Sequence, residues 1–152
     1  MPKRCFKSML GIGGLLGSLV FAMPARAELV FSDAWLRAVP PVSPTMAGYV
    51  SLENDSDKDL MITGVRTDIA GHTMLHAMTT AEDGTRQMTH LHHLTIPARG
   101  KASLSPGEKH LMLMKLKRVP SFGESVDICF QLAGDTEACT PFTVKRPSQF
   151  DG

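Results

Sequence analysis

Short runs in which apolar and polar residues alternate, separated by turn residues, fill most of the chain beyond residue 28. Alternation with a period of two is typical of strands that bury one face, and no long run has the spacing of an amphipathic helix. Asp83-Gly84 and Pro106-Gly107 are among the turn signals between the runs. The pattern predicts an all-β sandwich or barrel. The expected strands are Leu29–Phe31, Ala34–Ala38, Met46–Glu53, Asp59–Val65, Thr73–Thr79, Thr85–Leu91, Lys101–Leu104, His110–Lys115, Ser125–Leu132 and Ala138–Val144.

The N-terminus has the pattern of a secretory signal peptide. A basic start is followed by the apolar run Met9–Met23 and by Ala25-Arg26-Ala27. The alternative is a membrane anchor, but the run is shorter than the roughly 20 residues that a spanning helix needs. Cys5 precedes the apolar run, so it does not have the position of a lipid-attached cysteine that remains after cleavage. We therefore expect residues 1–27 to be a signal peptide and 28–152 to form one exported domain without stable membrane insertion.

The charge balance of the expected mature domain is slightly acidic. The leader would remove four of the 16 Lys and Arg residues and none of the 15 Asp and Glu residues, which leaves 12 cationic against 15 acidic side chains. No basic patch stands out, so the sequence does not favour nucleic acid as a partner.

Two cysteines remain in the mature domain, and their spacing indicates a disulfide. Residues 126–132 and 138–144 can pair as an antiparallel hairpin in which Cys129 lies directly opposite Cys139. An exported protein meets an oxidising environment, which favours the bridge over two free thiols. Pro141 predicts that the second strand lies at a sheet edge. The cysteines do not form a C-x-x-C motif, so a thiol-exchange role is not favoured.

Histidines and methionines recur in three segments of the mature chain. His76 and Met78 are followed by Met88, and then by His110 and Met112. Imidazole and thioether together form a soft donor set without thiols, which suits Cu(I) better than other common biological metals. Thioethers also need no deprotonation before they bind a metal.

Strand alternation places these donors away from the core. One face collects histidines and methionines, whereas Leu75, Leu111 and Leu113 lie on the opposite, core-facing side. The simpler interpretation is that each His is a surface residue and each Met fills a core gap, as we expect for Met46 and Met61. Three separate segments that each pair His with Met on the non-core face favour a metal site instead. The residues on that face are His72, Met74, His76, Met78, Met88, His90, His92, His110, Met112 and Met114.

The donor spacing resembles the periplasmic copper chaperone family PCu(A)C. The resemblance rests on His76, Met88 and His110-x-Met112, and on flanking segments around Trp35 and Tyr49, so it covers almost all of the mature chain. The chain departs from relatives at Ala77, where a Met often follows the first histidine. That position is not a ligand in the family pattern, so the ligand assignment is unaffected.

The resemblance implies a cupredoxin-like Greek-key β-sandwich in the periplasm that is not an enzyme. His76, Met88, His110 and Met112 would bind one Cu(I), with Met78 and Met114 as auxiliary thioethers. The partner would be a copper acceptor, either the CuA site of cytochrome c oxidase subunit II or a thioredoxin-like copper chaperone, and copper storage or tolerance is the alternative role. The His/Met-rich C-terminal tail that binds Cu(II) in some relatives is missing. A secondary Cu(II) site would have to use His90, His92 or His93, and the role of His72 is left open.

Two other function classes fit less well. A blue-copper electron carrier needs a Cys thiolate, two His and a weak Met, but no His follows either mature cysteine. A hydrolase is not favoured because neither HExxH nor GxSxG occurs. Glu53, Asp55, Asp57 and Asp59 cluster in an expected turn, which favours a solvated charged loop over a weak calcium site.

Overall fold

A computed structural model describes residues 29–146, and these residues form strands, turns and loops without a helix. The expected signal peptide lies outside the described residues. No helix long and apolar enough to cross a membrane is found in the described range. The strands are β1 (Leu29–Arg37), β2 (Thr45–Asn54), β3 (Leu60–Arg66), β4 (Ala70–Thr80), β5 (Arg86–Leu91), β6 (Leu94–Ile96), β7 (Lys101–Leu104), β8 (His110–Leu116), β9 (Ser125–Leu132) and β10 (Thr136–Lys145).

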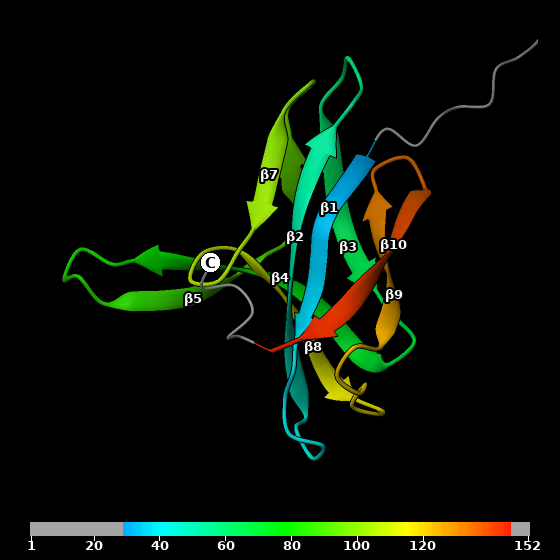
Figure 1. Cartoon of the computed structure of the whole chain (residues 1–152). Helices are drawn as coiled ribbons and strands as arrows, with labels where there is room; N and C mark the ends of the chain where they lie inside the picture. Colours follow the sequence, from blue (N-terminus) through cyan, green and yellow to red (C-terminus); the bar gives the residue numbers. More distant parts are fainter. Residues whose placement is uncertain (1–28, 147–152) are drawn as a thin grey trace, which may run out of the picture.

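The strands form one continuous hydrogen-bonded path that folds over into a sandwich (Figure 1). The order is β5-β4-β8-β2-β1-β10-β9-β3-β6, and β7 pairs with β2 beside β8. β3 and β4 are far apart in this order but contact each other, because the path folds back on itself. The prediction of an all-β, cupredoxin-like sandwich is confirmed.

The core is formed by the apolar residues that occupy every second position of the strands. Leu111 and Leu113 of β8 pack in one cluster with Ile62 of β3 and Phe130 of β9, so both layers contribute to the same core. Burial of these side chains is the main stabilising term of the fold. The fully buried set also includes Leu36, Met46, Leu52, Ile96, Leu104, Ile128 and Phe142.

The two methionines that we expect in the core differ in burial. Met46 is 1% exposed and fills the core as predicted, whereas Met61 is 40% exposed, so the core prediction for Met61 is wrong. Leu60 and Ile62 point inward from β3, and alternation therefore turns Met61 to the outside.

Two expected strands near the N-terminus are one strand in the structure. β1 pairs with β2 on both sides of an irregularity between Ser32 and Trp35, where Asp33 has a φ of 52°. A bulge lets a strand continue past a local break in alternation. Beyond the bulge, Trp35 packs on Tyr49 of β2 with ring centroids 4.5 Å apart. The parallel pairing of β1 with β10 joins the two layers at this end.

The β9–β10 hairpin has the register that the sequence predicted. Cys129 lies opposite Cys139, and a disulfide joins them. The prediction that the Pro141 strand is an edge strand is wrong, because β10 also pairs with β1 from Thr143 onward. Pro141 is tolerated because it precedes that pairing, so its missing N–H removes no hydrogen bond to β1.

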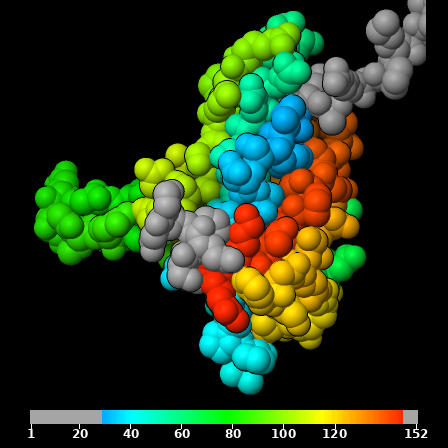
Figure 2. Space-filling model, in the orientation of Figure 1, coloured from blue at the N-terminus to red at the C-terminus, as the bar shows by residue number. Residues whose placement is uncertain are grey.

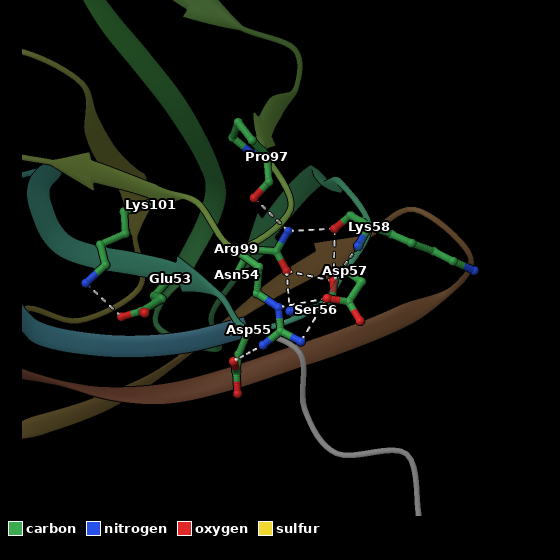
Figure 3. Close-up of polar contacts among 9 residues, drawn as sticks. All are labelled: Glu53, Asn54, Asp55, Ser56, Asp57, Lys58, Pro97, Arg99 and Lys101. Atoms are coloured by element: carbon green, nitrogen blue, oxygen red, sulfur yellow. Dashed lines mark hydrogen bonds and ion pairs between the residues drawn. The ribbon is translucent and has the colours of Figure 1, made fainter.

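The acidic turn after β2 is held by protein groups rather than left open for a metal (Figure 3). The Arg99 guanidinium bonds to the carboxylates of Asp55 and Asp57, at 2.8 and 2.9 Å. Asp59 accepts a hydrogen bond from the Ala98 amide. These contacts favour the charged-loop interpretation over a calcium site.

Asn54 is the buried polar anchor of the same turn, being 1% exposed. Its side-chain amide donates to the carbonyls of Lys58, Ile96 and Pro97, and its oxygen accepts from Ser56. Because the group is fully bonded, burying it costs little. The contacts tie β6 to the end of β2.

The disulfide predicts a measurable loss of stability when it is removed. The double substitution Cys129→Ala and Cys139→Ala should lower the free energy of unfolding by about 2–3 kcal/mol, because the bridge restricts the conformations that the unfolded chain can adopt. Urea unfolding without reductant measures the difference. Dithiothreitol should lower the stability of the wild type by the same amount and leave the double variant unchanged. Equal stability of wild type and variant would contradict the structural role.

Candidate metal centre

The His/Met face is formed by β5, β4 and β8, which are adjacent at one end of the strand path. The β4–β5 hairpin projects from the body of the molecule, at the left of Figures 1 and 2. Asp83-Gly84 makes its turn, as the sequence predicted: Gly84 has a φ of 85°, and Asp83 accepts hydrogen bonds from Thr85. The donors of β5 therefore lie on an outlying ribbon, while those of β8 lie next to the core.

The strand registers place three histidines in one row across the face. His76 of β4 is directly opposite His90 of β5 on one side and His110 of β8 on the other. The ring centroid of His76 is 6.0 Å from that of His90 and 5.7 Å from that of His110. His76 is thus the centre of the donor face.

The methionines occupy the positions beside this row. Met112 of β8 faces Met74, and Met88 of β5 faces Met78. Met112 and Met88 are therefore diagonal neighbours of His76, at separations that long side chains can span. The auxiliary residue Met114 faces His72 one step farther from the row.

The four predicted ligands differ in position and exposure. His110 lies directly opposite His76, whereas Met112 and Met88 lie on its diagonals, one on β8 and one on β5. Met88 is 52% exposed and is therefore the ligand most open to solvent.

The alternation predicted for the face holds, with one difference at His110. Leu75, Leu111 and Leu113 are buried in the core cluster, as expected from their opposite phase. His110 was expected to point away from the core, but it is only 7% exposed. Its Nδ1 lies 3.4 Å from the Glu108 carbonyl oxygen. If Nδ1 donates to that carbonyl, the Nε2 lone pair is left free for a metal.

His76 carries an unsatisfied polar atom. Its Nδ1 is buried and has no hydrogen-bond partner. Buried polar atoms are almost always paired, so an orphan nitrogen needs an explanation. The pKa of His76 is lowered, first by burial, then by repulsion from His110 and His90. A neutral imidazole with a free nitrogen at the centre of the face is a ready metal ligand.

The histidines of the row do not by themselves supply enough ligands to enclose a metal ion at His76. Among residues 29–146, the one close group of three His, Cys, Asp or Glu ligand atoms is Cys129, Glu137 and Cys139, and its sulfurs form the disulfide. The His row does not by itself gather three ligand atoms. A metal at His76 would therefore take sulfur from methionine.

Two contacts fasten the projecting hairpin to the turn before β8. The Met78 amide donates to the Glu108 carbonyl at 3.2 Å, and the Arg86 guanidinium donates to the Gly107 carbonyl. Because the Glu108 carbonyl also lies next to His110, this turn links the β4–β5 hairpin to the buried histidine.

Strand register gives two further residues of the face a place beside the predicted ligands. Met74, which alternation puts on this face, lies opposite Met112. His90, not Met88, is the residue directly opposite His76. Both facts depend on strand register, which the Asp83-Gly84 turn could have supplied for β5 by counting back from the turn.

The β-sandwich that carries this face has the fold of solved PCuAC domains. The family described as "Putative lipoprotein LpqE-like" matches residues 29–144, and the chain belongs to this family. The resemblance to PCu(A)C proteins is confirmed by the solved structures that it matches.

Three relatives illustrate the match. DR1885 from Deinococcus radiodurans is 31% identical in its apo solution structure, with 96% of this chain and 94% of that chain covered and a TM-score of 0.61. Its Cu(I) form is 37% identical over 78% of each chain, with a TM-score of 0.61. The copper-bound PCuAC domain from PmoF2 is 17% identical and covers 81% of this chain and 97% of that chain, with a TM-score of 0.66. "Putative lipoprotein Lxx21020" from Leifsonia xyli subsp. xyli is 24% identical over 87% of this chain and 82% of its own.

The lowered pKa of His76 predicts a pH dependence of the metal-free protein. The unfolded chain takes up a proton on this imidazole near its ordinary pKa of 6.5, whereas folded His76 resists protonation. Stability from this group is therefore fully present above pH 6.5 and declines as the pH falls toward the folded pKa. NMR titration of the ring should give a midpoint below 6.5. His110→Ala should raise that midpoint, and a wild-type midpoint at or above 6.5 would contradict the partial desolvation of the His76 ring.

Proposed function

We propose that the mature protein is an exported metallochaperone that binds one Cu(I) through His76, Met88, His110 and Met112 and passes it to another protein. The observation that carries this proposal is the buried, unpartnered Nδ1 of His76 in the middle of a thioether-lined face. A metal ion would satisfy that nitrogen. The existence of a Cu(I) form of DR1885, 37% identical to this chain, supports the choice of ion.

The donor set fits Cu(I) chemically. Two imidazoles and two thioethers are neutral, so the bound ion would keep its single positive charge and no ligand would need to lose a proton. Hard divalent ions gain little from thioethers. A thiolate site would be at risk of oxidation in an oxidising compartment, whereas this set contains no thiol.

The uneven exposure of the donors suits a carrier. His110 is buried and anchored beside Glu108, and it would hold the ion at the body of the sandwich. Met88 is exposed on the projecting hairpin, so its thioether would close over the ion and be the first ligand exchanged for one of the acceptor. Met78 and Met114, both partly buried, would serve as auxiliary thioethers.

The acceptor would be a protein with a soft copper site in the same compartment. The CuA site of cytochrome c oxidase subunit II and a thioredoxin-like copper chaperone both fit the proposal, and the periplasm is the compartment that we propose from the family resemblance and the expected signal peptide. No catalytic role is proposed. Both mature cysteines are in the disulfide, so they supply no thiolate for a blue-copper electron carrier.

Removal of one thioether should weaken Cu(I) binding without harming the fold. Met112→Leu and Met88→Leu keep the size of the side chain and are expected to lower Cu(I) affinity by at least about tenfold, since they remove a ligand. Anaerobic competition with a Cu(I) chelator measures the affinity.

Met46→Leu is the matched control, because Met46 is a core methionine that is 1% exposed. This variant should bind Cu(I) like the wild type. Wild-type affinity in both the Met88 and Met112 variants would show that the site is wrong.

A copper-transfer experiment distinguishes a delivery role from a storage role. The Cu(I)-loaded protein, mixed with an equal amount of an apo CuA domain or thioredoxin-like chaperone, should load the acceptor, which chromatography and metal analysis would quantify. If a small chelator can remove the copper but neither acceptor takes it from the Cu(I)-loaded protein, a storage role would be favoured instead.

A further inference from the structure

A second pair of imidazoles lies at the outer edge of the donor face. His90 is the penultimate residue of β5, and His92 follows directly after this strand ends at Leu91. Their ring centroids are 4.5 Å apart with a tilt of 55°, closer than the ring of His76 is to that of either His90 or His110. Both side chains are exposed.

The two rings share a cavity that is separate from the proposed Cu(I) donors. The cavity has a volume of about 240 Å³, and its lining includes His90, His92, Met74, Thr73 and Thr63. His76, Met88, His110 and Met112 are not part of this lining. His93, the next residue in sequence, does not line it either.

The position of the pair opens it to solvent and to incoming ions. β5 is the end strand of the path, so nothing in the described chain pairs with its outer edge. The ring of His90 is 6.0 Å from that of His76, whereas it is 4.5 Å from that of His92. His90 is therefore closer to a partner outside the Cu(I) donor set than to the centre of that set.

The chemistry of the pair differs from that of the Cu(I) site. Two imidazoles with open positions for water form a harder donor set, which suits divalent ions, and Cu(II) binds such nitrogen sites most tightly among the first-row divalent metals. The nearby Met74 thioether would add at most a weak ligand to Cu(II).

We propose that His90 and His92 form a second metal site that takes Cu(II), with water in the remaining coordination positions. The site stands beside the Cu(I) site and uses none of its four ligands. The proposal therefore does not rest on the proposed chaperone function, and either can fail without the other.

The test is titration of the protein isolated after export with Cu(II) sulfate in a non-coordinating buffer, in competition with glycine. His90→Ala and His92→Ala should each lower Cu(II) affinity by at least about tenfold, since each removes half of the imidazole ligands. Electron paramagnetic resonance of the wild type should show hyperfine coupling to two imidazole nitrogens. Both side chains are exposed, so the variants should fold normally, which circular dichroism checks.

His93→Ala is the matched control and should bind Cu(II) within about twofold of the wild type, because His93 lies outside the cavity lining. His92→Ala should keep wild-type Cu(I) affinity, which separates this site from the proposed chaperone site. Cu(II) binding that survives in the His90 and His92 variants would overturn the proposal. So would an equal loss of Cu(II) affinity in His93→Ala, or loss in His76→Ala with none in His92→Ala.

Discussion

The antiparallel register between β4 and its two neighbours is the constraint on which the donor face depends. It sets His76 opposite both His90 and His110 and brings Met112 and Met88 to the diagonals. Because side chains alternate between faces, a slip of one residue in either pairing would turn the donors of one strand to the other side. The turn at Asp83-Gly84 and the buried Leu111 and Leu113 hold the two registers in place.

The strands that carry the donors differ in how firmly the sandwich holds them. β8 pairs with both β2 and β4 and carries core leucines on its other face, so His110 and Met112 are set on a rigid strand. β5 pairs with β4 alone and lies on a projecting hairpin. The ligands on β8 are therefore preorganised, while Met88 is exposed on the hairpin, which suits a protein that must both hold an ion and release it.

Local patterns in the sequence were enough to predict most of the strands and the face on which each donor lies. They could not show how the strands bend or which strands meet in space. The three residues of β6 are too short for periodicity to identify, and the bulge at Asp33 that joins two expected strands breaks the alternation. The interior position of the Pro141 strand has the same cause: its parallel partner β1 lies about a hundred residues away in sequence, beyond the reach of local patterns. The burial of His110 and the orphan nitrogen of His76 likewise arise from packing between strands, not from spacing.

X-ray absorption spectroscopy of the Cu(I)-loaded protein tests the central claim most directly, because it counts the atoms around the ion. A site built from His76, His110, Met88 and Met112 predicts two nitrogen and two sulfur neighbours, with an edge characteristic of Cu(I). A first shell of nitrogen and oxygen alone, without sulfur, would contradict the account.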